Sequence, residues 1–249
     1  MVVTHMTPRP EQPVFFDLEG TRNAVLSALG AEEAARIQPH LRAVSLVLGE
    51  VTGVMGEAVD RVLFPEAGMI SGILDSNQNA SVEFSVVGRE GAWGALDALS
   101  DTPRLGRGLV QAAGWGWSLP SSVLREEFGR GGALQRELLS YIKLFYAMAA
   151  VNGLCNRLHT VEERLSRWLL IVRNGTESDE FDLEPAFVAA MLGSRPSGVP
   201  IALGVLQQAG LISVDGTRIR LLSVPSLEAS SCECHCIMAT QLEERFDNA

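Results

Sequence analysis

The side chains best suited to bind a metal or undergo redox chemistry lie close together near the end of the chain. Cys232, Cys234, His235 and Cys236 fall within five residues. Cysteines one residue apart lack the two- to four-residue spacing of structural zinc sites, and so short a segment cannot surround an ion without a further ligand. Cys155 is the only other cysteine. We therefore expect no metal or cofactor and favour a buried, inert cysteine pair, with metal binding or thiol redox sensing as alternatives.

Motifs of the common catalytic sites are absent from the sequence. It contains no Ser-His-Asp elbow, phosphate-binding P-loop or dinucleotide fingerprint. His159 follows a long predicted helix, and we expect it to hydrogen-bond at that helix junction. The sequence therefore predicts a binding protein and not an enzyme.

A candidate nucleic-acid-binding unit lies towards the C-terminus. Apolar residues at helical spacing predict helices over 187–192 and 199–206, which end at Gly193 and Gly210. Two short runs around Asp215-Gly216 then predict a β-hairpin. Two helices joined by a tight turn and followed by a hairpin form a winged helix, whose second helix can enter a DNA major groove. A small α+β domain without a DNA role is the alternative.

The charge of the chain weighs against tight, non-specific DNA binding. Its formal net charge is −10, and no segment is strongly basic. Five carboxylates precede the predicted unit: Glu177, Asp179, Glu180, Asp182 and Glu184. This balance still allows a specific dimer that presents a few arginines to the groove.

Residues 44–119 carry short alternating runs broken by glycine and proline. Examples are Val44-Leu46-Leu48, Val62-Phe64 and Val82-Phe84-Val86. Alternation of period two indicates strands with one buried face, and many short strands with frequent turns are typical of a sandwich or jelly roll. We expect a β jelly-roll, and an α+β fold for the whole chain.

A long helix is predicted after the Gly131-Gly132 break. Its apolar residues recur in steps of four and three, which is the spacing of a coiled-coil seam, and one asparagine could set the register. The expected dimer-helix residues are Leu134, Leu138, Tyr141, Phe145, Met148 and Asn152. The alternative is that this stripe packs on the chain's own barrel. The length of the helix favours a dimer.

The 249 residues leave room for two ordinary domains. No uninterrupted apolar run approaches the roughly 20 residues that span a bilayer, and the N-terminus lacks the apolar core of a signal peptide. We expect a cytoplasmic protein without a membrane partner. The expected parts are a flexible arm (1–20), a sensor domain (21–131), a dimerisation helix (132–158), a winged-helix domain (159–236) and a tail (237–249).

Several short motifs follow one another between about Leu26 and Cys234. They are Leu48–Val51, Gly56-Glu57, Val62–Gly68, Val87–Gly91, Cys155–His159, Glu163–Leu170, Ala202–Gln207 and Ser231–Cys234. In this order they resemble the Crp/Fnr superfamily of bacterial transcription regulators. The resemblance implies a cyclic-nucleotide-binding-like jelly roll, a dimerisation helix and a winged helix. It also implies three kinds of partner: a pseudo-palindromic DNA site, a second copy of the chain, and RNA polymerase or another regulatory protein.

The resemblance places a ligand pocket around Arg89, Glu90 and Gly94, with Arg104 or Arg107 as the phosphate-binding arginine. Relatives that bind cyclic AMP have a glycine–glutamate pair whose carboxylate accepts from the ribose hydroxyl. Here the matching pair is Gly94-Ala95, so that acceptor is missing. We expect the barrel not to bind cyclic AMP.

The predicted recognition helix also departs from the family pattern. Pro196 replaces an arginine that often reads a guanine in relatives, and Pro200 is tolerated only if the helix begins near Ser197. The residues expected to bind DNA from the turn are Ser194, Arg195 and Ser197. Those expected to contact phosphates are Arg173, Arg218 and Arg220. A dimer that has lost DNA recognition and acts through protein contacts is the main alternative.

Overall fold

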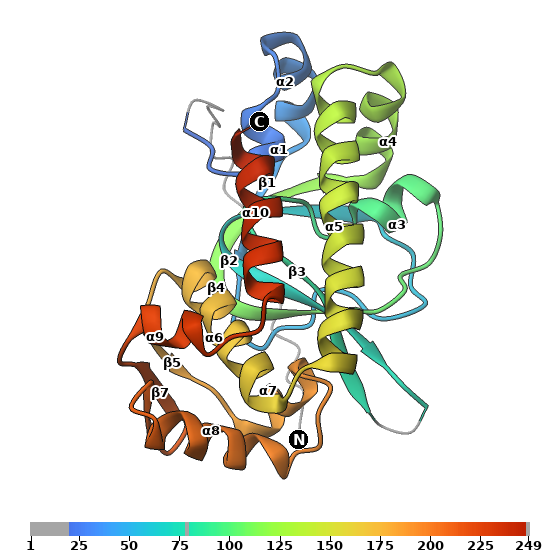
Figure 1. Ribbon diagram of the computed structural model, residues 1–249. Helices are drawn as coiled ribbons and strands as arrows, with labels where there is room; N and C mark the ends of the chain where they lie inside the picture. The colour runs from blue at the N-terminus through green and yellow to red at the C-terminus, as the bar shows by residue number, and fades with distance from the viewer. Residues whose placement is uncertain (1–19, 78–79, 248–249) are drawn as a thin grey trace.

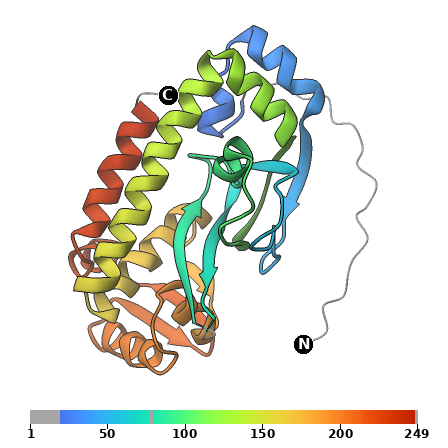
Figure 2. The ribbon, with the colours of Figure 1, turned by 90° about the vertical axis from the view of Figure 1, so that its right-hand side faces the viewer.

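The computed structural model describes residues 20–77 and 80–247 (Figure 1). A curved sheet with short helices forms one half of the molecule, and a smaller sheet with further helices forms the other. Helix α5 (Ala133–Leu158) runs along both halves (Figures 1 and 2). The arm expected over 1–20 lies outside the described residues, apart from Gly20.

The larger sheet is antiparallel, with strand order β1-β4-β2-β3. Its strands are β1 (Arg42–Leu46), β2 (Arg61–Asp75), β3 (Ser81–Val87) and β4 (Arg107–Pro120). β2 and β4 contain 15 and 14 residues, so they are longer than the short runs predicted. Register shifts between Pro65 and Ile70 bend this pair, as bulges do, and let two long strands curve like a barrel wall.

Short helices pack at one end of this sheet. They are α1 (Ala24–Ser27), α2 (Ala31–Ile37), the 3-10 helix η1 (Gln38–His40), α3 (Ala95–Ser100) and α4 (Ser121–Arg130). Asn23 caps α1 and is fully buried. Its amide donates to the carbonyls of Pro65 and Gly91 at 3.0 and 2.9 Å, which ties the helix to the barrel.

Helix α5 turns the predicted dimer stripe towards its own protomer. We call this stripe the inner stripe; it comprises Leu134, Leu138, Tyr141, Phe145, Met148 and Asn152. Leu134 and Leu138 are fully buried beneath α4, and Tyr141 packs on the sheet. Phe145 stacks edge-on against Phe84 of β3, with ring centroids 6.0 Å apart.

The prediction that these residues join two protomers is therefore wrong, and the alternative of packing on the chain's own barrel is right. Asn152 has a local role as well. Its amide donates to the Phe84 carbonyl at 3.3 Å, and its oxygen accepts from Arg167 at 2.9 Å. The stripe faces inward because the apolar face of the sheet needs a cover. By length and composition alone, α5 is a helix that could span a membrane; here its inner face is packed in the core.

The second half of the molecule contains a three-stranded sheet of order β5-β7-β6 with four helices. Its elements are α6 (Val161–Thr176), β5 (Glu180–Asp182), α7 (Pro185–Met191), α8 (Gly198–Gln208), β6 (Ile212–Asp215), β7 (Arg218–Leu221) and α9 (Val224–Ala229). The predicted helices and hairpin correspond to α7, α8, β6 and β7. The sequence analysis did not anticipate β5.

A tail was expected over 237–249, but residues 237–247 belong to a helix, α10 (Cys234–Asp247). This helix lies alongside α5 (Figures 1 and 2). Met238, Leu242 and Arg245 recur at helical spacing. Met238 is buried in the core, and Arg245 is buried in an ion pair with Glu137 of α5. Apolar contact on one side and this ion pair hold the segment as a helix.

Candidate functional site

The turn between α7 and α8 places Arg195 at the start of the candidate recognition helix. Gly193 ends the α7 segment with φ of +54°, a left-handed conformation that suits glycine. Ser197 is the N-cap residue of α8, although its side chain makes no capping hydrogen bond. Pro200 is then the third helical residue, where it disturbs no hydrogen bond of the helix interior. The start of α8 at Gly198, directly after Ser197, agrees with the condition that the sequence set for Pro200.

The outward face of α8 is uncharged and mainly apolar. Ile201 and Val205 have 65 % and 46 % of their surface exposed, and Gly204 and Gln208 lie on the same face. The opposite face is buried in the core through Val199, which is fully buried, and its neighbours. α8 is therefore anchored firmly and presents methyl groups, not charges, to a partner.

Arg195 is exposed and makes no ion pair with any residue that the structure describes. Ser197 is exposed beside it. Ser194 is half-buried, and its Oγ is enclosed without a hydrogen-bond partner in the described part of the chain. Of the three turn residues predicted to meet DNA, two are therefore accessible and the third lies partly under the turn.

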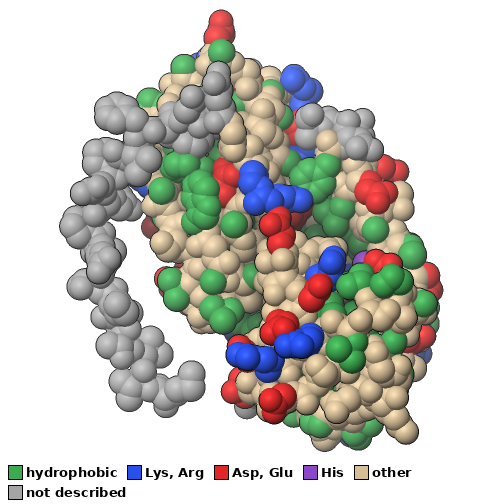
Figure 3. All heavy atoms as spheres, turned by 90° about the vertical axis from the view of Figure 1, so that its left-hand side faces the viewer, with side chains coloured by type: hydrophobic (Ala, Val, Ile, Leu, Met, Phe, Trp, Pro, Cys, Tyr) green, Lys and Arg blue, Asp and Glu red, His purple; other side chains and the backbone are tan. Residues whose placement is uncertain are grey.

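The three arginines expected to contact phosphates are each paired with a carboxylate. Arg173 pairs with Asp179 at 2.6 Å, Arg220 with Glu180 at 2.7 Å and Arg218 with Asp182 at 3.7 Å. These carboxylates lie on β5 or just before it, and β5 is hydrogen-bonded to β7. Figure 3 shows the outcome on one face of the molecule, where basic and acidic side chains alternate. The three-stranded sheet of β5, β7 and β6, which we call the wing, therefore carries little net positive charge.

The arginine expected to bind a cyclic phosphate is enclosed by the barrel. Arg104 is only 8 % exposed, and its guanidinium lies over the Trp93 ring, 5.5 Å from the centroid. A Cβ added at Gly94 would lie 3.1 Å from its Nη1. Burial lowers the pKa of Arg104, and the charges of Asp97 and Glu57 oppose that shift. Nη1 has no hydrogen-bond partner among the described residues.

Arg107 lies elsewhere: it begins β4 beside the end of β2, where it pairs with Asp75 at 2.7 Å. Of the two alternatives, Arg107 is therefore held by a carboxylate of the β2–β3 hairpin, whereas Arg104 lies beside Gly94. Arg89 and Glu90 also lie apart from Arg104. The five predicted pocket residues thus belong to three different places.

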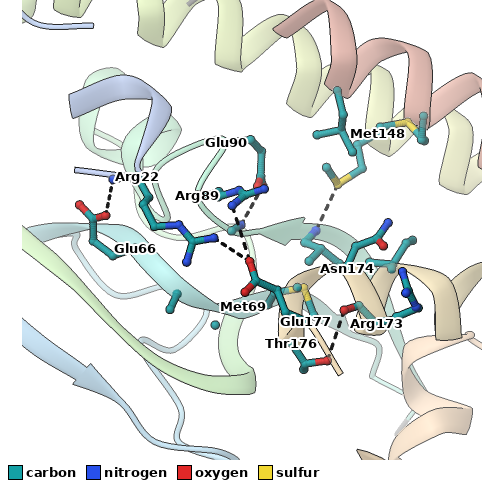
Figure 4. A pocket seen from close by; sticks show the side chains of 18 of the residues that line it. Arg22, Glu66, Met69, Arg89, Glu90, Met148, Arg173, Asn174, Thr176 and Glu177 are labelled. Atoms are coloured by element: carbon teal, nitrogen blue, oxygen red, sulfur yellow. Dashed lines mark hydrogen bonds and ion pairs between the residues drawn. The ribbon is translucent and has the colours of Figure 1, made fainter. Parts of the chain in front are cut away.

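Arg89 and Glu90 line a cavity of about 670 Å³ between the larger sheet, α5, α6 and α10 (Figure 4). Burial raises the pKa of Glu90, and the hydrogen bond that it accepts from the Gly88 N–H, 2.7 Å long, opposes the shift. Met69 and Met148 add flexible apolar surface. A molecule in this cavity would contact both halves of the protein.

Two arginines of the barrel half converge on one carboxylate at the end of α6. Glu177 accepts a hydrogen bond from Arg22 at 2.6 Å, and Arg89 lies 3.8 Å away (Figure 4). The hydrogen bond from Arg22 lowers the pKa of Glu177. Glu177 has a φ of +53°, which is uncommon for a residue with a side chain. This cluster connects the two halves beside the cavity.

Comparison with known proteins agrees with this architecture. Residues 163–230 match the model of the Crp-like helix-turn-helix domain. No curated protein matches the sequence. A candidate Crp/Fnr-family regulator from Eubacterium rectale has a TM-score of 0.69 at 12 % identity, over 83 % of this chain and 96 % of that one. A Crp/Fnr-family regulator from Thermus thermophilus has a TM-score of 0.63 at 18 % identity, over 76 % and 98 %.

A c-di-GMP-responsive global regulator from Xanthomonas campestris has a TM-score of 0.65 at 13 % identity, over 78 % of this chain and all of that one. Residues 163–230 thus match a Crp-like helix-turn-helix domain, and the chain has the fold of these Crp/Fnr-family structures. Its Crp-like domain, residues 163–230, contains six arginines, no lysine and eight carboxylates. The near balance of the wing is therefore a property of the whole domain.

In this Crp/Fnr-type fold, four side chains of types that can ligate a metal ion meet where α5 ends. They are Cys155, His159, Cys232 and Cys234, and their ligand atoms all lie within 4.8 Å of one another. Cys155 Sγ is 3.5 Å from Cys232 Sγ, and Cys234 Sγ is 3.7 Å from His159 Nδ1. The three cysteines are buried and free.

The set named from the sequence was partly wrong, because His235 and Cys236 do not join this group. Cys236 is exposed on α10, and burial lowers the pKa of His235 nearby. Cys234 and Met238 mark the buried side of α10, so Cys236 falls on its exposed side, and His235 is half-buried between them. Cys155 supplies the further ligand that the sequence analysis required. His159 lies at the predicted helix junction.

The charges around the thiols distinguish Cys155 from its neighbours. Burial raises the pKa of the Cys155 thiol, but the hydrogen bond from His159 and the charge of Arg167 outweigh it, so the net shift is downward. Burial raises the pKa of Cys232 to about 12. The hydrogen bond to Cys155 raises the pKa of His159, whose Nε2 lies 3.0 Å from Glu233. The site thus combines one acidic thiol with a polarised imidazole.

Proposed function

We propose that the protein regulates transcription by binding DNA as a homodimer through α8 of its Crp-like helix-turn-helix domain. The observation that carries this proposal is the exposed α8 face, with Arg195 at its N-terminal end and without an ion pair to any described residue. The N-terminal residues of such a helix contact base edges in the major groove. Two of them related by a two-fold axis select a pseudo-palindrome with half-sites about one helical turn apart.

The dimer would form through the face of α5 that points away from the barrel. We call this face the outer stripe; it comprises Leu139, Lys143, Tyr146, Ala150 and Gly153. These residues recur in steps of four and three, the spacing of a coiled-coil seam, and all are exposed. Tyr146 is 75 % exposed and Leu139 is 53 % exposed. Small residues at Ala150 and Gly153 would let two helices approach closely.

The barrel would not bind cyclic AMP. The turn at Gly94-Ala95 provides no carboxylate for a ribose hydroxyl, and Arg104 is packed between Trp93 and backbone. Calorimetric titration of the full-length protein with cyclic AMP should show no heat of binding. Micromolar affinity would overturn this part of the proposal.

The DNA proposal is tested by selection from a pool of random duplexes at moderate salt. The expected result is enrichment of an inverted repeat by the wild-type protein. Arg195→Ala should lose that enrichment, whereas Arg125→Ala, an exposed arginine of α4 far from α8, should retain it. Light scattering of the same samples should give the mass of a dimer. Wild-type protein that is folded and dimeric but enriches no sequence contradicts the proposal.

A second candidate function is a dimeric module that has lost DNA recognition and binds another protein. Two observations favour it: the apolar outward face of α8 and the pairing of the wing arginines with carboxylates. Exposed Ile201 and Val205 would then contact a protein surface. This candidate predicts that Ile201→Glu has no DNA phenotype, since there would be none to lose, whereas the regulator predicts loss of the selected site.

A further inference from the structure

The group formed by Cys155, His159, Cys232 and Cys234 lies at the junction of three segments, outside the face proposed to bind DNA. Cys155 is on the last turns of α5, and His159 is in the linker between α5 and α6. Cys232 follows α9, and Cys234 begins α10. Cys155 and Cys232 are 77 positions apart in sequence, and His159 and Cys234 are 75 positions apart. Two distant segments therefore bring three thiols and an imidazole together.

The spacing of the ligand atoms fits one tetrahedral ion. Four ligands bonded to zinc, with Zn–S bonds of about 2.3 Å, lie about 3.8 Å from each other. In the structure, the Sγ atoms of Cys155 and Cys232 are 3.5 Å apart, Cys234 Sγ and His159 Nδ1 are 3.7 Å apart, and all four atoms lie within 4.8 Å of one another. A cluster with several irons would require the cysteine sulfurs to stand farther apart.

The surroundings suit a buried thiolate site. Three thiolates, a neutral imidazole and Zn²⁺ carry one net negative charge. Arg164 and Arg167 are each 8 % exposed, and their charges act on the cysteines. Nη2 of Arg164 and Nε of Arg167 lack hydrogen-bond partners in the described part of the chain. These cations can offset the charge.

The imidazole has the second partner that a ligating histidine usually needs. With Nδ1 facing Cys234, Nε2 lies 3.0 Å from the carboxylate of Glu233. A carboxylate on the far nitrogen fixes the tautomer and ring orientation of a metal-bound histidine. Glu233 thus comes from the same short segment as two of the thiols.

We propose that Cys155, His159, Cys232 and Cys234 bind one structural Zn²⁺. Binding releases the thiol protons and closes a Cys3His tetrahedron with no position left for substrate. The ion would join the end of α5 and the start of α6 to the start of α10. It would therefore fix the winged-helix half, and α10 as one wall of the cavity, relative to the long helix.

The test uses the full-length protein, prepared under reducing conditions, exposed to Zn²⁺ and dialysed. Metal analysis should give one zinc per chain for the wild type. Cys236→Ser, the matched control with the exposed cysteine two residues from Cys234, should retain it. Cys234→Ser and His159→Ala should retain less than a tenth as much. Glu233→Gln, which leaves all four ligands, should bind zinc about 10- to 100-fold more weakly.

Cobalt provides a second readout that does not depend on the variants. Co²⁺ added to the wild type should produce the intense visible bands of tetrahedral coordination and sulfur-to-cobalt charge transfer at a ratio of one per chain. If a ligand variant fails to fold, as circular dichroism would show, this titration decides. The proposal is overturned if reduced wild-type protein binds neither ion. It is equally overturned if both ligand variants retain zinc, or if iron with labile sulfide is found.

Discussion

Glu180 of β5 and Arg220 of β7 are register partners in neighbouring strands, and their side chains form an ion pair of 2.7 Å. Asp182 and Arg218 repeat the arrangement at the other end of the same short strand, at 3.7 Å. Directly opposed charges stabilise a strand pair modestly, by about 0.2–1 kcal/mol. Their larger effect is electrostatic, since each carboxylate cancels a cation that could otherwise attract phosphate.

Removing these carboxylates should strengthen DNA binding. The double variant Glu180→Gln, Asp182→Asn frees two arginines, so affinity for any duplex should rise, and the plot of log affinity against log salt should steepen by about 0.9 for each phosphate newly contacted. Fluorescence anisotropy at several salt concentrations measures both. Glu126→Gln, an exposed carboxylate of α4, is the control. Equal slopes for the double variant and the control would show that the wing does not meet DNA.

Substitution of Arg195 and substitution of Arg218 should affect DNA binding in different ways. Arg195→Ala should weaken the selected site by about 1–3 kcal/mol and blur its sequence preference, because a base contact carries specificity. Arg218→Ala should weaken all duplexes alike and flatten the salt dependence. Competition between the selected site and a scrambled duplex separates the two. A uniform loss for Arg195→Ala would make it a phosphate contact only.

The two faces of α5 should respond differently to substitution. Tyr146→Glu places charge on the outer stripe and should convert a dimer into folded monomers, because burying opposed carboxylates is costly. Leu138→Ala, on the inner stripe, should leave the mass unchanged and lower the free energy of unfolding by about 2–5 kcal/mol. Light scattering and urea denaturation measure these effects. A dimer that survives Tyr146→Glu would place the interface elsewhere.

Glu83 should make stability depend on pH. Burial raises its pKa from 4.5 to about 7, although the charge of Arg167 and a hydrogen bond with Ser71 oppose the shift. Between these values the folded protein holds a proton that the unfolded chain has lost. The free energy of unfolding should therefore fall as pH rises from 4.5 to 7, by up to about 3 kcal/mol, and then level off.

Glu83→Gln should remove this fall in the free energy of unfolding. The free energy of unfolding of the variant should therefore exceed that of the wild type by more at pH 8 than at pH 5. Urea denaturation at both pH values measures the difference. Glu126→Gln, whose carboxylate is exposed, should follow the wild type at each pH. A constant difference between Glu83→Gln and the wild type would mean that Glu83 stays charged in the fold.

The sequence was sufficient for elements whose pattern is local. The helices α7 and α8 and the β6–β7 hairpin follow from apolar spacing and from Gly193, Gly210 and Gly216. The start of α8 followed from the steric limits of Pro200. These features depend on neighbours within one or two turns, so periodicity and turn chemistry identify them.

Features set by contacts between distant segments were missed or misassigned. α5 carries two stripes of coiled-coil spacing, and only the barrel decides that Tyr141 faces inward while Tyr146 faces out. β5 has three residues, too few for a periodic signal. α10 had a detectable signal in the spacing of Met238, Leu242 and Arg245, which the thiol-rich segment before it obscured.

The candidate metal site could not be assembled from sequence because its two halves lie far apart in the chain. Cys155 and Cys232 are 77 positions apart, and His159 and Cys234 are 75 positions apart. The sequence identified Cys232, Cys234 and the need for an outside ligand. It did not indicate that the end of α5 would meet the start of α10. Cys155 and His159, which stand four residues apart where the long predicted helix ends, were the available clue.

The exposed methyl groups of Ile201 and Val205 bear on which bases the protein would tolerate. Alkyl side chains at the floor of a major groove distinguish thymine from cytosine by its C5-methyl group. 5-Methylcytosine carries that same group. If α8 reads DNA through these two residues, cytosine methylation within the half-site should raise affinity towards that of thymine at the same position, which would make the epigenetic state of the operator part of what the protein recognises.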